Sequence, residues 1–187
     1  MRSRLFAAAL AAVLACWSLP AAAQSELTGR FMLDTVDGKR VTDEAWRGKV
    51  RAMTFGYTFC PDICPTTLST MSGAMDRLGA EAGRVAMLFV TVDPERDTQA
   101  QLKDYLTAFP GIVGLTGTEA MVNSAARNFR VRYERRPAPA NDPKAYAVDH
   151  SAGIYIMDRT GKFVAKLGHM ATPEELAERL QTVLGQP

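Results

Sequence analysis

Two runs rich in apolar residues, 50–59 and 84–93, constrain the fold of this chain more than any other feature. A strand with one exposed face alternates apolar and polar residues, so continuous runs of this kind are typical of strands buried on both faces of a sheet. Each run is followed by the spacing of an amphipathic helix, at 65–80 after the first and at 97–109 after the second. This alternation of strand and helix predicts right-handed βαβ units.

Shorter elements complete the pattern. The sequence predicts a hairpin over 29–50 that turns at Asp37-Gly38, a short strand or loop over 111–117, a helix over 118–131, a second hairpin over 151–168 and a closing helix over 172–184. This order fits an α/β fold, a thioredoxin-like sandwich in which a central mixed sheet is flanked by helices and preceded by an N-terminal β-hairpin. At the start of the last helix, Thr172 and Glu175 are spaced as a capping box.

Residues 135–150 interrupt the regular pattern. Three prolines lie in the stretch from Pro137 to Pro143, with an Asn-Asp pair among them, and this composition predicts a loop rather than a helix or a strand. Long loops inside a compact domain tend to be functional. In the predicted fold, the end of this loop at His150 reaches the sheet near the two cysteines of the domain.

Cys60 and Cys64 lie where the first buried strand gives way to its helix, and they are spaced as C-x-x-x-C. A helix N-terminus presents unpaired N–H groups and the positive end of the helix dipole, and both favour the thiolate form. If the two residues share one helix face, their Cα atoms are about 6 Å apart, within the range of roughly 4.4–6.8 Å for a disulfide. The spacing therefore permits either a disulfide or a two-sulfur grip on a metal ion, and does not decide between them.

His150, in the stretch Asp149-His150-Ser151, is the candidate third ligand. Two thiolates and one imidazole suit Cu(I), whereas zinc prefers a fourth ligand, for which Asp62 or Asp149 could supply an oxygen. Asp149 could instead orient His150. The other histidine, His169, is expected on the surface just before the last helix.

Three segments, FGYTFCPDICPTTL, TVDPERDT and VDHSAGIYIMDRTGKFV, together resemble the Sco/SenC family of copper proteins. The family signature is C-P-D-x-C-P followed by a distant D-H-S, and the resemblance spans roughly residues 26–184. It implies a thioredoxin-like fold and a copper ion, Cu(I) or Cu(II), held by Cys60, Cys64 and His150. Phe59 departs from the family pattern, because many relatives have a histidine or another polar residue there, and it makes the rim of the site more apolar.

The resemblance also implies a function and its partners. Family members are exported or membrane-anchored and are associated with copper delivery to cytochrome c oxidase. We therefore expect a metallochaperone that passes copper to the dinuclear site in the copper-bearing subunit of a haem–copper oxidase, with other copper carriers and thiol reductants as further partners. The alternative is a thiol–disulfide reductase that keeps the acceptor's cysteines reduced, with Cys60 as the attacking thiolate and Cys64 as the resolving thiol.

Residues 1–23 have the pattern of an export signal, with a basic start, an apolar run and an A-x-A site that ends at Ala23. The alternatives are a retained anchor and lipidation at Cys16. Each of the three places the domain of residues 24–187 in the periplasm, either soluble or anchored to the membrane.

The charge of the chain argues against one class of partner. The sequence has 22 basic and 20 acidic residues, and the domain that remains without Arg2 and Arg4 is neutral. Neutrality argues against a nucleic-acid partner, whose phosphates require basic side chains, and against a polybasic membrane patch. We expect the mature domain to be a monomer.

Overall fold

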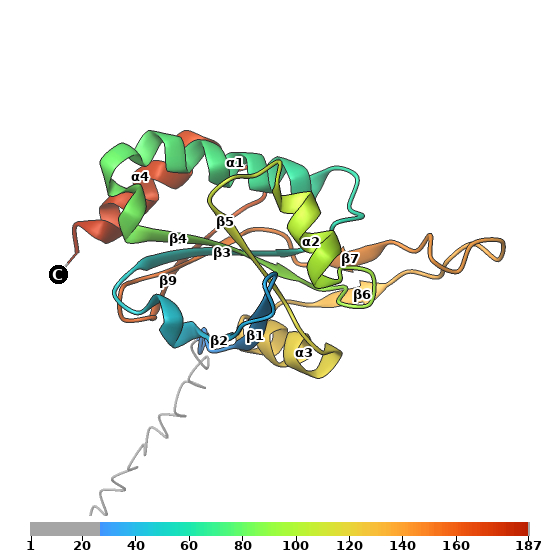
Figure 1. Ribbon diagram of the computed structural model, residues 1–187. Helices are drawn as coiled ribbons and strands as arrows, with labels where there is room; N and C mark the ends of the chain where they lie inside the picture. Colours follow the sequence, from blue (N-terminus) through green and yellow to red (C-terminus); the bar gives the residue numbers. More distant parts are fainter. Residues whose placement is uncertain (1–26, 187) are drawn as a thin grey trace, which may run out of the picture.

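The computed structural model describes residues 27–186, so the predicted signal segment, Cys16 included, lies outside the described residues. At the centre is a seven-stranded mixed sheet with the strand order β2-β1-β5-β4-β3-β8-β9 (Figure 1). The strands are β1 (Met32–Thr35), β2 (Arg40–Thr42), β3 (Val50–Gly56), β4 (Val85–Thr91), β5 (Ile112–Thr116), β8 (Ile154–Met157) and β9 (Phe163–Leu167). β3, β4 and β5 run parallel, whereas β8 lies antiparallel to β3. This mixed sheet confirms the predicted fold class.

β3 and β4 form the middle of the sheet. All seven residues of each strand are buried, as the continuous apolar runs predicted. The two strands pair in register from Val50 opposite Val85 to Gly56 opposite Thr91. Both end before the apolar runs do, so the next residues leave the sheet at its carboxyl edge. Parallel strands deliver their following loops to the same edge, and this is where α/β sheets place their functional sites.

Helices cover both faces of the sheet. They are α1 (Ile63–Leu78), α2 (Gln99–Leu106), α3 (Glu119–Asn128) and α4 (Pro173–Leu184), with two short 3-10 helices, η1 (Asp43–Trp46) and η2 (Gly79–Arg84). α1, α2 and α4 share one apolar core on one face, whereas α3 packs on the other face (Figure 1). Within residues 27–186, none of the helices has the length and apolar character that crossing a membrane requires.

Three of the helices begin at threonine caps, and one of these, at Thr172, is the cap that the sequence predicts. The Thr172 hydroxyl accepts a hydrogen bond from the Glu175 N–H, and the Glu175 carboxylate accepts one from the Thr172 N–H, which confirms the capping box of α4. Thr98 and Thr118 cap α2 and α3 through their hydroxyls. These contacts satisfy N–H groups that the first turn of a helix would otherwise leave unpaired.

Both predicted hairpins are present. β1 and β2 pair around Asp37-Gly38, where Gly38 adopts a φ of +80° that suits glycine. β8 and β9 form the second hairpin, although β8 begins at Ile154, later than the predicted start at residue 151. β1 also pairs antiparallel with β5, which the sequence pattern did not predict, and this pairing makes the N-terminal hairpin one edge of the main sheet.

The segment 135–150, predicted to be a loop, is partly regular. Its ends form a separate two-stranded antiparallel sheet of β6 (Tyr133–Arg135) and β7 (Val148–His150), in which Tyr133 lies opposite His150. The prolines are confined to the chain between these strands, so the flanking residues keep the N–H groups that pairing requires. The prediction of a loop was therefore wrong for the two ends of the segment and right for the part between them.

Candidate metal centre

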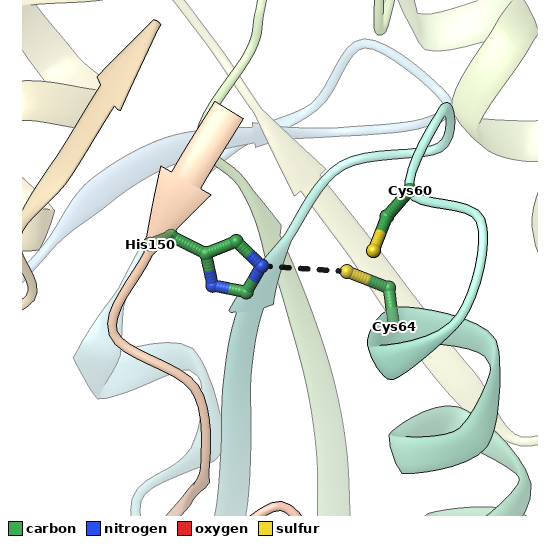
Figure 2. A group of neighbouring side chains, drawn as sticks. All are labelled: Cys60, Cys64 and His150. Atoms are coloured by element: carbon green, nitrogen blue, oxygen red, sulfur yellow. Dashed lines mark hydrogen bonds between the residues drawn. The ribbon is translucent and has the colours of Figure 1, made fainter. Parts of the chain in front are cut away.

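Three predicted site residues meet at the carboxyl edge of β3. Cys60 lies in the loop after β3, Cys64 in the first turn of α1, and His150 at the end of β7 (Figure 2). The two sulfurs and a ring nitrogen of His150 all lie within 4.8 Å of one another. Cys64 Sγ lies 3.5 Å from His150 Nε2. Both cysteines are free thiols, so two sulfurs and one nitrogen converge on one point.

The two cysteines do not share a helix face, contrary to the geometry considered from their spacing. α1 begins at Ile63, two residues before its predicted start, so Cys64 is helical and Cys60 is not. Cys60 is held instead by a turn, in which its N–H donates to the Tyr57 carbonyl at 3.2 Å. Asp62 occupies the N-cap position, but its exposed side chain accepts no capping hydrogen bond. The turn, rather than the helix, places the Cys60 sulfur beside that of Cys64 (Figure 2).

A buried carboxylate fixes the start of this turn. Asp97 is fully buried and accepts hydrogen bonds from the Thr58 N–H at 3.0 Å, the Thr58 hydroxyl at 2.6 Å and the Thr91 hydroxyl at 2.6 Å. Burial raises the pKa of Asp97, and the hydrogen bonds from Thr58 and Thr91 oppose that shift. In the sequence, Asp97 is only the first residue of the helical pattern at 97–109. Its position next to Thr98, directly after the loop that ends a buried strand, was the only signal for this role.

The two thiols have opposite acidities. The hydrogen bond with the Cys64 thiol, together with backbone N–H groups at Asp62 and Cys64, lowers the pKa of Cys60 to about 5, against the opposing effect of burial. The pKa of Cys64 is raised, first because its thiol is engaged with Cys60 and second because it is buried. Near neutral pH the pair therefore consists of a half-buried thiolate at Cys60 and a protonated thiol at Cys64. A metal that displaces the Cys64 proton would find both sulfurs in place.

His150 presents one nitrogen to the sulfurs and buries the other. Its ring lies edge-on to Tyr57, with 6.1 Å between the ring centroids. Nδ1 is buried and has no hydrogen-bond partner among the described residues. Asp149, considered as the residue that orients His150, forms an ion pair with Arg136 instead. Within residues 27–186, neither Asp62 nor Asp149 joins the cluster of Cys60, Cys64 and His150, so no carboxylate completes a four-ligand zinc site there.

Asp93, just after the end of β4, shapes the wall beside the cysteine loop. Asp93 is fully buried, forms ion pairs with Arg96 and Arg135, and accepts a hydrogen bond from the Tyr146 hydroxyl at 2.8 Å. A hollow of about 440 Å³ lies between the cysteine loop and the loop that precedes β7. Its lining includes Phe59, whose side chain is 53% exposed on the rim of the site.

Comparison with known proteins identifies the family. The family model described as SCO1/SenC matches residues 20–185. This chain belongs to the SCO1/SenC family. The SCO1/SenC match covers every strand and helix described above and all three residues of the cluster. The thioredoxin-like fold and the family resemblance seen in the sequence are therefore both confirmed.

Relatives within the SCO1/SenC family include proteins of known structure. The chain is 42% identical over 160 residues to the protein sco1 of Schizosaccharomyces pombe, which covers 83% of this chain and 60% of that protein. It resembles the structure of Bradyrhizobium japonicum ScoI with copper bound, with a TM-score of 0.76, 41% identity and coverage of 83% of this chain and 98% of that one. It also resembles yeast Sco1 with copper bound, with a TM-score of 0.76, 35% identity and coverage of 87% and 90%. The chain thus spans less than two thirds of the fission yeast relative and nearly all of the solved domains.

Proposed function

We propose that this protein is a copper metallochaperone that holds copper through Cys60, Cys64 and His150 and passes it to a partner. The observation that carries the proposal is the convergence of two sulfurs and one imidazole nitrogen within 4.8 Å, from three separate segments of the fold. Thiolate and imidazole are ligands that copper prefers, and a set with few ligands favours Cu(I). The copper-bound structures of Bradyrhizobium japonicum ScoI and yeast Sco1, which share this fold, support the same ion.

The exposure of the site suits transfer as well as binding. Cys60 is half-buried, and Phe59 and Ile63 of the same segment have exposed side chains, whereas Cys64 is buried. A thiol of an incoming partner can therefore approach the metal from the Cys60 side and replace one ligand at a time. The apolar rim gives that partner a surface to contact, because exposed aromatic and aliphatic side chains are enriched where proteins meet.

We propose the copper-bearing subunit of a cytochrome c oxidase as the acceptor, at its dinuclear copper site. The support is the resemblance of the CPDICP and DHS segments to the Sco/SenC pattern. This assignment places the domain of residues 24–187 in the periplasm, as a soluble protein after cleavage at Ala23 or as a protein anchored through residues 1–23. The export pattern of that segment supports this location.

A thiol–disulfide reductase is the second candidate, and one observation favours it. The pKa of Cys60 is lowered to about 5 while that of Cys64 is raised, which is the asymmetry expected of an attacking thiolate and a resolving thiol. In this reaction the Cys60 thiolate would attack a disulfide of the acceptor, and Cys64 would then displace the reduced acceptor. Cys60 and Cys64 would end as a disulfide, and the two electrons would pass to the acceptor's sulfurs.

Copper titration separates the two candidates. Reduced protein is titrated with Cu(I) without oxygen, with a competing chelator, for the wild type, His150→Ala and the matched control His169→Ala. The chaperone hypothesis predicts that the wild type binds one equivalent of copper and that the copper affinity of His150→Ala is more than about 100-fold lower. Even a group that only orients a ligand contributes about 10–100-fold to metal affinity. The exposed His169 is expected to contribute nothing.

The opposite result would support the reductase. If His150→Ala binds copper as tightly as the wild type and retains full dithiol exchange, the imidazole has no role in metal binding. The exchange assay uses a model disulfide substrate and the same three proteins, so both activities are compared in one set of variants.

A further inference from the structure

Arg96 makes several polar and ring contacts beside the cluster, although it touches none of the three candidate ligands in the described contacts. It lies between β4 and α2, and its side chain is only 8% exposed. Its Nε donates to the buried carboxylate of Asp93. Burial of an arginine is unfavourable unless ion pairs and hydrogen bonds compensate for the lost hydration. The other contacts of this guanidinium therefore indicate which segment it holds in place.

Those contacts are with the loop that precedes His150. Arg96 Nη1 donates to the carbonyls of Lys144 at 2.9 Å and Tyr146 at 2.8 Å. The guanidinium also lies 3.6 Å from the centre of the Tyr146 ring, and the Tyr146 hydroxyl donates to Asp93 at 2.8 Å. Arg96 therefore contacts two backbone carbonyls and one aromatic ring of the same loop. Its ion-pair partner, Asp93, binds the hydroxyl of that ring.

Arg96 also lies over two rings of the cysteine loop. Its guanidinium carbon is 4.7 Å from the centre of the Phe59 ring and 5.6 Å from that of Tyr57. Phe59 directly precedes Cys60, and Tyr57 contacts the ring of His150. Arg96 thus lies between the loop that supplies the sulfurs and the loop that leads to the imidazole.

The loop needs such a contact. β6 and β7 form a sheet of only two strands, and an isolated pair of strands is marginally stable in water. The chain between them is proline-rich and mostly exposed, so it buries little apolar surface of its own. Tyr146 lies four residues before His150, close enough that its position affects where the imidazole points.

Arg96 also shows a sign that stability alone did not select this arrangement. Its third nitrogen, Nη2, is buried and has no hydrogen-bond partner among the described residues. A buried donor without a partner costs free energy, and a fold selected only for stability would avoid it. Strained or unsatisfied groups of this kind tend to collect near functional sites.

We propose that Arg96 is a positioning residue of the metal centre: it clamps the loop that precedes His150 against the cysteine loop and so holds the imidazole at the two sulfurs. The proposal rests on the copper-binding function proposed above and adds a residue to it. Arg96 acts on copper through His150 and not through the thiols. Its loss should therefore weaken the imidazole as a ligand while leaving the two sulfurs as they are.

A double-mutant cycle tests this route. Arg96→Met keeps an unbranched apolar stem and removes the fork of donors, and His150→Ala removes the ligand. We expect Arg96→Met to weaken Cu(I) binding about 10-fold in the wild-type background, the usual cost of losing a group that orients a ligand. In the His150→Ala background we expect no further loss beyond about twofold, because the residue through which Arg96 acts is absent. Equal losses in both backgrounds, or no loss in the wild type, would overturn the proposal.

Arg135→Met is the matched control. Arg135 pairs with the same Asp93 and lies 5.0 Å from the same Tyr146 ring, but its side chain is 40% exposed and no contact to the loop carbonyls is found for it in the described part of the chain. Its loss should leave the affinity within about twofold of the wild type. Electron paramagnetic resonance of the Cu(II) form adds a signature that a general loss of stability would not change: the nitrogen coupling of the imidazole should weaken in Arg96→Met and persist in Arg135→Met.

Hydrogen exchange on the copper-free protein keeps the test independent of the proposed function. Arg96→Met and Tyr146→Leu, which attacks the clamp from the loop side, should both speed exchange of the amides in β7 and leave α1 and α4 unchanged. If the wild type binds no copper, the chaperone proposal fails while this measurement still decides on the clamp. Unchanged exchange in β7 in both variants would overturn the clamp, and faster exchange throughout the molecule would show that Arg96 serves only the stability of the fold.

Discussion

Cys60 and Cys64 lie four residues apart but differ in their chemistry. Cys60 sits in a turn with its sulfur half-buried, and it is the thiolate of the pair because the Cys64 thiol and nearby backbone N–H groups lower its pKa. Cys64 is buried in the first turn of α1 and keeps its proton. The two residues therefore present a reactive thiolate at Cys60 and a less reactive, protonated thiol at Cys64 to a metal ion or a partner.

This difference predicts the pH dependence of alkylation. In the reduced, metal-free protein, the rate at which iodoacetamide modifies Cys60 should follow its thiolate fraction, with a midpoint near the pKa of about 5. The rate should be constant from pH 6 to pH 8 and fall below pH 5, as protonation removes the nucleophile. A free cysteine would instead titrate near 8.5. Mass spectrometry after short pulses at each pH identifies which cysteine is modified.

Cys64→Ala is the control for this measurement. It removes the first cause of the lowered pKa of Cys60, so the midpoint should move upward, toward that of a free thiol. A midpoint near 8.5 in the wild type would contradict the assignment of Cys60 as the thiolate.

The sequence could single out Cys60, Cys64 and His150 because thiols and imidazole are side-chain types that bind metal ions and because their motifs mark a strand–helix corner and the end of a loop. It could not identify the roles of Arg96 and Asp97. Each of these is an ordinary charged residue in a loop, and its function comes from burial and from partners that only the folded chain brings near. The same limit applies to Asp149, whose ion pair with Arg136 turns it away from the role of orienting His150.

At the scale of elements, the end of β3 determines where the cysteines can sit. A Cβ atom on Gly56, the last residue of β3, would lie 2.7 Å from Cys64 Sγ and 2.8 Å from a ring carbon of Phe89. No side chain larger than hydrogen fits between the strand and the sulfur. The glycine thus lets α1 begin directly against the sheet.

Gly56→Ala should disturb both the fold and the site. Forcing a methyl group into a packed core typically costs about 1–3 kcal/mol of unfolding free energy, and the displaced sulfur should weaken copper binding. Urea denaturation and the copper titration measure the two effects. Gly83→Ala is the matched control, because its Cβ would meet no atom within 4 Å. Equal unfolding midpoints for the two variants would show that the contact at Gly56 is easily relieved.

Elements with strong local signals could be predicted, and elements made by distant pairing could not. β3, β4 and α4 follow from continuous apolar runs and a capping box, which are properties of the local sequence. The pairing of β1 with β5 and of β6 with β7 depends on which strands the fold places side by side. Strands of only three or four residues carry no periodic signal of such pairing, so the sequence predicts a loop over 135–150, where β7 and the last residue of β6 lie.

At the scale of the whole molecule, the metal centre joins segments from both halves of the domain. β8, which follows His150, lies beside β3, which precedes Cys60, and this antiparallel pairing brings the imidazole to the sulfurs. Binding at the completed site should therefore stabilise the fold. A ligand that binds only the folded state adds about 2.7 kcal/mol at a free concentration of 100 times its Kd.

We expect Cu(I), buffered by a chelator, to raise the thermal unfolding midpoint of the reduced wild type. The gain should stay below the value for purely native-state binding, because the unfolded chain keeps two thiols that also bind copper. In His150→Ala the gain should be smaller still, since the folded site then offers little more than the unfolded chain. Circular dichroism at matched free copper measures the unfolding midpoint of each protein. An equal rise of the midpoint in the two proteins would contradict a three-ligand native site.

The spacing of the ligands along the chain has a consequence for the order in which the site is made. Cys64 and His150 are 86 residues apart, and β4, α2, β5 and α3 all lie between them. A ribosome or an export channel releases the chain from its N-terminus, so the two thiols emerge long before the imidazole. Until β8 docks on β3, the chain carries a bare dithiol that can oxidise or bind metal weakly. Full three-ligand capture is thus possible only once β8 has paired with β3, and tight copper binding reports that this late pairing has formed.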